Sequence, residues 1–121
     1  MAVVLIIDDS PTELHLFQNM LEKNGFETLV ADSGEEGLRQ AKTSRPDCIL
    51  MDVVMPGMNG FQATRKLTRD PDTAAIPVIM VTTKDQETDK IWGMRQGAVE
   101  YIVKPVAEQQ LVATINQVMA G

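Results

Sequence analysis

Residues 48–56 read CILMDVVMP, an apolar run that ends in one carboxylate, Asp52, and is followed by a turn. An Asp at such a point can be an ordinary strand terminator or a helix cap. Two other apolar runs also end in charged residues: Asp8 and Asp9 close the first run, and Lys104 follows the last. Because three acids and one lysine stand where strands are expected to stop, we take Asp52 as the candidate reacting group.

The apolar pattern around this stretch predicts five strands that alternate with five helices. Residues 3–7 form a continuous aliphatic run rich in β-branched residues, which is typical of a strand buried on both faces of a parallel sheet. Further strands are expected at residues 26–31, 48–51, 76–81 and 99–103. Helices are expected to begin after Ser10, Ser33 and Asn59, and at about Gln86 and Ala107. This alternation indicates an α/β fold with a doubly wound parallel sheet covered by helices on both sides.

The first two helix starts carry a recognisable pattern. Ser10 and Glu13, and likewise Ser33 and Glu36, have the spacing of a capping box, in which each member accepts a hydrogen bond from the other's backbone. Pro11 stands at the first helical position, where its fixed φ and missing N–H are favourable. Reciprocal capping boxes are therefore expected at both starts.

Length and composition indicate a single globular domain over residues 1–121, because the chain is too short for two domains. The chain is 44% hydrophobic and 23% charged, and its net charge is −6. An acidic chain is a poor binder of nucleic acid or of an anionic membrane surface. No apolar run approaches the roughly 20 residues of a membrane helix, and the single Cys48 cannot form an internal disulfide, which is compatible with a cytoplasmic location.

The candidate site lies at the carboxyl ends of the predicted strands, where open α/β sheets bind their ligands. If the strand order is 2-1-3-4-5, the first and third strands are neighbours and their terminal acids converge. Carboxylates that share a pocket repel one another, so they must take up protons or bind a cation. Oxygen ligands with room for water favour Mg²⁺.

The same strand ends carry groups suited to phosphoryl transfer. Lys104 can act as a point charge for a phosphoryl oxygen and Thr82 as a hydroxyl donor. With these groups and a cation around it, Asp52 is a plausible nucleophile towards phosphorus.

Simpler roles are open for each of these residues. Asp8 and Asp9 could only cap the first helix, Lys104 could be a solvated strand-end lysine, and Thr82 could be a strand former. His15 stands off the apolar stripe of its helix and is expected at the surface, and Trp92 is expected to be partly packed.

Four segments taken together resemble the receiver domain of bacterial two-component response regulators, the CheY-like family, over the whole chain. They are IDDS at residues 7–10, MDVVMPGMNG at 51–60, VIMVTT at 78–83 and YIVKP at 101–105. The resemblance implies a flavodoxin-like sheet in the order 2-1-3-4-5. Residues 60–65 and 83–90 are especially similar to the stand-alone PilH-type regulators of twitching motility, which work beside a CheA-like histidine kinase.

The resemblance also implies a phosphoacceptor and a metal site. Asp52 would be the phosphoacceptor. Asp9 and Asp52 would bind Mg²⁺ directly, Asp8 would bind it through water, and the backbone carbonyl of Val54 would complete the protein's ligands.

Three further residues would connect this site to an output surface. Lys104 would bind the phosphoryl group, with a cis peptide before Pro105. Thr82 would be the switch hydroxyl, and Tyr101 would turn inward behind it. The implied function is a phosphorylation-dependent switch in chemotaxis-like or type IV pilus motility control, not an enzyme acting on other molecules. Its partner would bind the face made by the fourth helix, fifth strand and fifth helix.

Other functions have specific requirements. A haloacid-dehalogenase-type phosphohydrolase would carry a second Asp where Val54 stands, and a flavodoxin-type flavin module would need a hydroxyl- and glycine-rich loop where residues 8–11 read DDSP. A receiver that only drains phosphate from a shared kinase, a phosphate sink, fits the sequence as well as an effector does. Val54 and Lys84 differ from the Asn and Glu often found in swimming-chemotaxis members, and we expect slower loss of phosphate because Val54 offers the attacking water no hydrogen bond.

Overall fold

The computed structural model describes residues 2–120, so Met1 and Gly121 of the expected 1–121 domain lie outside the described residues. Five strands form one parallel sheet in the order β2-β1-β3-β4-β5, which confirms the expected topology. The strands are β1 (Val3–Ile7), β2 (Glu27–Ala31), β3 (Cys48–Met51), β4 (Val78–Thr82) and β5 (Glu100–Val103).

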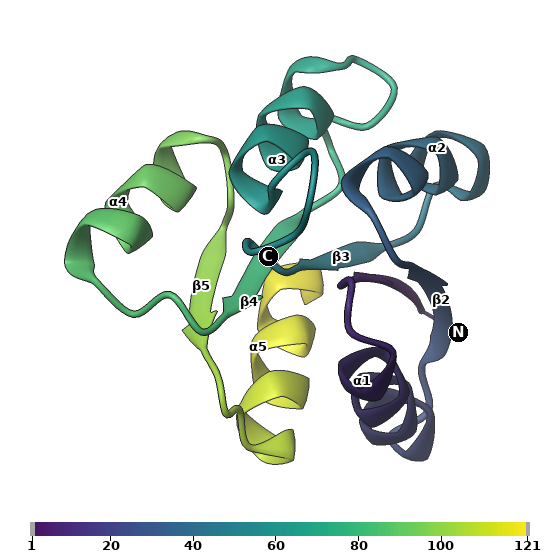
Figure 1. Ribbon diagram of the computed structural model, residues 1–121. Coiled ribbons are helices and arrows are strands. Elements are labelled where there is room, and N and C mark those ends of the chain that lie inside the picture. The colour runs from purple at the N-terminus through teal and green to yellow at the C-terminus, as the bar shows by residue number, and fades with distance from the viewer. Residues whose placement is uncertain (1, 121) are drawn as a thin grey trace.

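Helices cover both faces of the sheet (Figure 1). Helices α1 (Pro11–Lys23) and α5 (Glu108–Ala120) lie on one face, and α2 (Gly34–Ser44) and α3 (Gly60–Arg69) lie on the other. Helix α4 (Glu87–Arg95) packs beside β5, where Gly93 lies close to Met80 and Tyr101. This three-layer arrangement is the doubly wound α/β fold.

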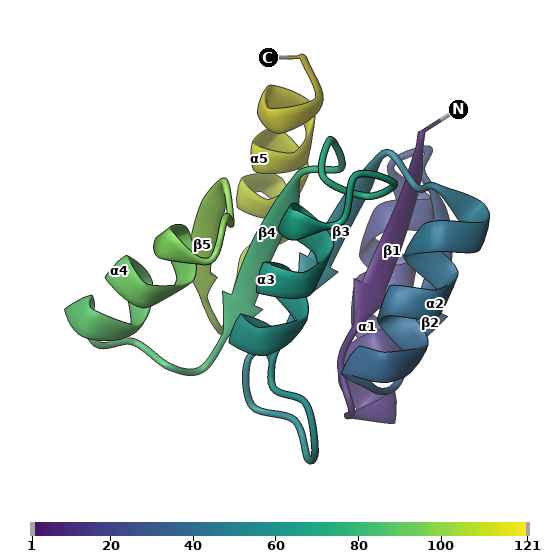
Figure 2. The same ribbon diagram turned by 90° about the horizontal axis from the view of Figure 1, so that it is seen from above.

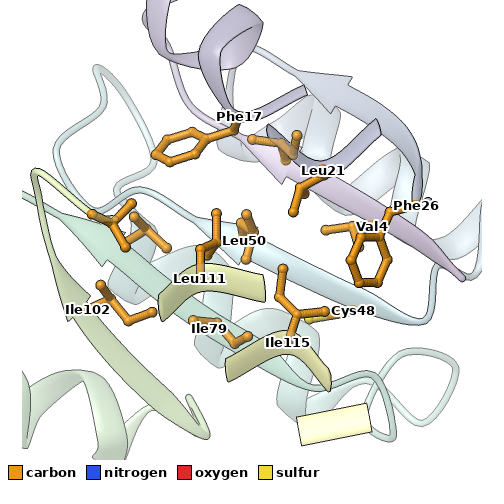
Figure 3. Packing of buried hydrophobic residues seen from close by; sticks show 13 residues of the cluster. Val4, Phe17, Leu21, Phe26, Cys48, Leu50, Ile79, Ile102, Leu111 and Ile115 are labelled. Atoms are coloured by element: carbon orange, nitrogen blue, oxygen red, sulfur yellow. The ribbon is translucent and has the colours of Figure 1, made fainter. Parts of the chain in front are cut away.

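Alternate residues of the central strands supply two hydrophobic cores. On one face, Val4 and Ile6 of β1 join side chains of α1 and α5, among them Phe17, Leu21 and Leu111 (Figure 3). On the other face, Leu5 and Ile7 join side chains of α2 and α3. Burial on both faces explains why these strands read as continuous apolar runs instead of alternating polar and apolar residues.

Strand register places the site residues opposite one another. Ile7 of β1 pairs with Met51 of β3, so Asp8 and Asp52 each follow a paired residue. Thr82 of β4 pairs with Val103 of β5, and the N–H of Lys104 donates to the Thr82 carbonyl at 2.8 Å. Parallel pairing alone therefore brings four chemically active residues to one edge of the sheet.

Strands β2 and β5 begin one residue later than predicted, and two further details differ from the sequence predictions. Strand β4 runs from Val78 to Thr82 instead of over residues 76–81, because Pro77 has no N–H to donate to a neighbouring strand. The capping boxes expected at Ser10 and Ser33 are only half formed. Each serine hydroxyl accepts a hydrogen bond from the N–H three residues on, at 3.3 and 3.2 Å. The second bond, in which the serine N–H would donate to the glutamate carboxylate, is missing.

The missing halves have identifiable causes. The N–H of Ser10 donates to Asp8 Oδ1 at 3.0 Å, and the carboxylate of Glu13 lies beside Lys104. The carboxylate of Glu36 pairs with Arg39 one turn along α2. A full capping box is found instead at α3, between Asn59 and Gln62.

Candidate functional site

Three carboxylates converge where β1 and β3 end. Asp8, Asp9 and Asp52 each offer one oxygen, and these oxygens lie within 4.8 Å of one another. Figure 2 shows the loop after β3 and the loop after β4 leaving the same end of the sheet. Asp8 and Asp52 are buried and Asp9 is exposed, so the cluster opens to solvent on the side of Asp9.

Lys104 is the cation of this cluster. Its Nζ lies 2.8 Å from Asp8 Oδ2, 3.1 Å from Glu13 Oε1 and 3.8 Å from Asp52 Oδ1. The side chain is 10% exposed and its Nζ lies 5.7 Å from the centroid of the Phe17 ring. Lys104 is therefore a buried, paired amine, and not a solvated strand-end lysine.

Glu13 is a site residue that the sequence analysis missed. Its spacing from Ser10 indicated a helix cap, whereas its carboxylate faces an amine 91 positions later in the chain. The available signal was the position of an acid in the first turn of the helix that follows Asp8 and Asp9. That turn lies over the same edge of the sheet.

The cluster carries more negative than positive charge, and the pKa values reflect it. Burial, and then the charge of Asp8, raise the pKa of Asp52 from 3.8 to about 6, against the opposing effect of Lys104. Burial alone would lower the pKa of Lys104, but hydrogen bonds to Asp8 and Glu13 and the charge of Asp52 outweigh it and raise that pKa. The carboxylates thus lack enough positive charge, which is the condition for binding a cation.

The loop after β3 fits tightly around the backbone of Asp52. The N–H of Gly60 donates to the Val53 carbonyl at 2.9 Å, and a Cβ on Gly60 would lie 2.0 Å from the carbonyl oxygen of Asp52. Val53 is buried, whereas the side chain of Val54 is 56% exposed. The role of the Val54 carbonyl as a metal ligand stays a prediction.

Thr82 and Tyr101 both contact the loop that leads from β4 into α4. Thr82 is fully buried, and its Oγ1 accepts a hydrogen bond from the N–H of Lys84 at 3.3 Å. The hydroxyl of Tyr101 donates to the Lys84 carbonyl at 2.8 Å. Both residues thus contact the loop between β4 and α4, while the movement of the Tyr101 ring stays a prediction.

A comparison with protein families decides what kind of domain carries this arrangement. The model of the response regulator receiver domain matches residues 4–116, which is most of the chain. The chain belongs to this family. The expected CheY-like fold is confirmed by the sheet order.

Individual relatives refine the placement of this receiver domain. It is 60% identical to Protein PilH of Pseudomonas aeruginosa over 121 residues, the full length of both chains. It is 33% identical to the transcriptional regulatory protein PhoP of Bacillus subtilis over 116 residues. The matched region covers 96% of this chain and 48% of PhoP. The expected resemblance to PilH-type regulators is confirmed.

Solved structures agree with this placement. The chemotaxis protein CheY4 of Vibrio cholerae superposes with a TM-score of 0.92 at 33% identity, over 98% of both chains. A response regulator from Chloroflexus aurantiacus gives a TM-score of 0.94 at 32% identity, over 99% of this chain and 98% of that one. Neither the phosphohydrolase nor the flavin-binding alternative is supported by these relatives.

The remaining candidates of the receiver domain lie outside the cluster. His15 is exposed, as expected, and Trp92 is 46% exposed on α4. Cys48 is buried, and burial raises the pKa of its thiol to about 12, so it is not a reactive thiolate at neutral pH. Among residues 2–120, the helices are all too short or too polar to cross a membrane.

Proposed function

We propose that Asp52 of this receiver domain accepts a phosphoryl group from a CheA-like histidine kinase. The supporting observation is the placement of the Asp52 carboxylate between two further carboxylates and the amine of Lys104. Other carboxylates in the cluster have different tasks: Asp8 holds Lys104 at 2.8 Å, and Asp9 is the exposed edge of the site.

The donor set fits Mg²⁺. The three carboxylates have only the amine of Lys104 as a positive partner, so they offer hard oxygen ligands with surplus negative charge. The exposed side at Asp9 leaves room for the water that Mg²⁺ retains. Asp8, Asp9 and Asp52 would hold the ion together with the backbone carbonyl of Val54. A bound Mg²⁺ supplies positive charge to the oxygens of the incoming phosphoryl group.

The chain's own residues position and neutralise the transferred group. An oxygen of the ionised Asp52 carboxylate attacks phosphorus, the P–N bond to the kinase histidine breaks, and its electron pair returns to the imidazole nitrogen. Lys104 Nζ, already 3.8 Å from Asp52 Oδ1, donates to a phosphoryl oxygen. The product is an aspartyl phosphate, and its added charge is the signal.

The output surface is the face of α4, β5 and α5. The Thr82 side chain moves so that its hydroxyl donates to a phosphoryl oxygen, and Oγ1 thereby leaves the N–H of Lys84, which loosens the loop that Tyr101 also binds. Exposed apolar side chains lie on and beside α4 and β5, namely Ile91, Trp92, Met94, Val99 and Val103. We place the downstream target on this face and, from the similarity to PilH, the output in the control of type IV pilus motility.

The test is phosphorylation by a small phosphodonor such as phosphoramidate with Mg²⁺. Intact mass is expected to show the gain of one phosphoryl group in the parent and none in Asp52→Asn, whereas the control Asp72→Asn is labelled like the parent. EDTA is expected to abolish the gain. A parent that stays unlabelled, or an Asp52→Asn variant that is labelled equally, contradicts the proposal.

A further inference from the structure

A basic groove lies between α2 and α3, outside the phosphorylation site. Its volume is about 1020 Å³. The cations that line it are Arg39 and Lys42 of α2 and Arg65, Lys66 and Arg69 of α3. They are five of only eleven Lys and Arg residues in a chain of net charge −6. Nearly half of the chain's basic residues therefore line this one groove.

The cations on α3 are free to pair with an outside anion. Among residues 2–120, Arg65, Lys66 and Arg69 are exposed and take part in no ion pair. Lys42 pairs with Asp70 at 3.2 Å across the end of the groove, and Arg39 pairs with Glu36 of its own helix. The helix dipole favours cations in the last turn of α3, but it does not explain Arg65 or the facing cations of α2.

The bottom of the groove is apolar. Leu38 of α2 and Met58 of the loop after β3 are partly buried and pack on the core between α2, α3 and the sheet, and Leu67 of α3 is 1% exposed. The groove therefore has an apolar floor with basic rims on both sides. An occupant must match both features.

We propose that this groove binds an acidic amphipathic helix of a partner protein. A helix with an apolar stripe and carboxylates on both flanks would place the stripe on Leu38 and Met58 and its carboxylates against the rims, the recognition mode known as helix-in-groove. Arg65 and Arg69 stand one turn apart on α3, so they match carboxylates spaced one turn apart. Helix α3 offers a contact of about 15 Å at 1.5 Å per residue, roughly three turns of a partner helix.

Other anionic ligands match the groove less well. A nucleotide would gain affinity from an aromatic side chain on which its base could stack. The described residues that line the groove include no Phe, Tyr or Trp. The sugar-phosphate backbone of a nucleic acid has no apolar stripe, so it would gain nothing from the apolar floor of Leu38 and Met58.

The test uses a fluorescein-labelled peptide of about four helical turns, with leucines on one face and glutamates on both flanks. Fluorescence anisotropy is measured without phosphodonor, so the result does not depend on the phosphorylation of Asp52. We expect saturable binding that Arg65→Glu/Arg69→Glu weakens at least about tenfold. The variant Lys90→Glu/Arg95→Glu makes the same charge change on α4 and tests whether the peptide binds the output face instead; we expect it to weaken binding much less than Arg65→Glu/Arg69→Glu.

Additional measurements identify the site and the ligand class. Amide NMR shifts on titration are expected to concentrate on α2 and α3, and Arg65→Ala/Arg69→Ala, a milder change, is expected to weaken binding less than the charge reversal. Circular dichroism checks that every variant is folded. Absence of binding, equal weakening by the α4 variant, equal affinity for a peptide with glutamine in place of glutamate, or tighter binding of a single-stranded oligonucleotide at the same residues would each overturn the proposal.

Discussion

Replacing Asp52 by Asn is expected to stabilise the fold at neutral pH when no divalent cation is present. Asp52 is 8% exposed, and its pKa is raised from 3.8 to about 6, first by burial and then by the charge of Asp8. A carboxyl group with a higher pKa in the folded than in the unfolded chain destabilises the folded state once it ionises. Asn removes that charge, and Lys104 keeps its closer partners Asp8 and Glu13.

The size of the effect follows from the pKa. One pKa unit corresponds to about 1.4 kcal/mol, so a rise from 3.8 to about 6 corresponds to about 3 kcal/mol. Solvent on the side of Asp9 screens the repulsion, which reduces the expected gain to about 1–2 kcal/mol. Well below pH 3.8 Asp52 is protonated in both states and costs nothing; the parent loses stability relative to the variant as the pH rises from about 3.8 to about 6, and the full difference is present above that range.

Urea unfolding in EDTA, followed by far-UV circular dichroism, measures this difference at pH 4.5 and 7.5. The variant should be more stable than the parent at pH 7.5, and at pH 4.5 its advantage should fall to about a third of that difference. Mg²⁺ should narrow the gap at pH 7.5, because a ligand of the folded state stabilises it. Asp72→Asn, at an exposed carboxylate after α3, should change little at either pH. A gap that is absent, or that does not depend on pH, would refute the reasoning.

Three further predictions concern the surroundings of Asp52. Glu13→Gln removes one of the two carboxylates that hold Lys104 closely, which frees the amine to bind an added phosphoryl-like group. We therefore expect beryllofluoride with Mg²⁺ to bind about fivefold more tightly, for about 1 kcal/mol, with Glu22→Gln on the same helix as the control; unchanged affinity would show that Glu13 does not compete for the amine. Gly60→Ala places a Cβ 2.0 Å from the Asp52 carbonyl oxygen, so unfolding by urea should show a loss of about 2–4 kcal/mol, unlike Gln109→Ala at an exposed position of α5. Val54→Asn supplies a hydrogen bond of about 1 kcal/mol to the attacking water and should speed loss of phosphate about fivefold, as measured by intact mass over time; an unchanged or slower rate would contradict this role.

Much of the fold could be predicted because its determinants are local. The continuous apolar runs identify β1, β3 and β4, and the charged residues that end them locate the site at one edge of the sheet. The resemblance to receiver domains then supplied the strand order that brings Asp8 beside Asp52. Neither step required knowledge of how distant side chains meet.

The parts that failed depend on such distant contacts. Glu13 has the spacing of a capping residue, but an ion pair with Lys104 in a buried site competes with a solvated cap, and only the folded sheet brings the two together. Pairing between Asp8 and Lys104 spans 96 positions in the sequence. The basic groove was missed for the same reason, since its cations belong to two helices that are unremarkable when each is read alone.

The ion pairs of Lys104 join elements from opposite ends of the chain, so the phosphorylation site depends on complete folding. The amine comes from the end of the last strand and its partners from the ends of the first and third strands and from the first helix. A chain in which any of these elements is still unfolded lacks the complete constellation. We therefore expect phosphorylation of Asp52 to require the fully folded domain.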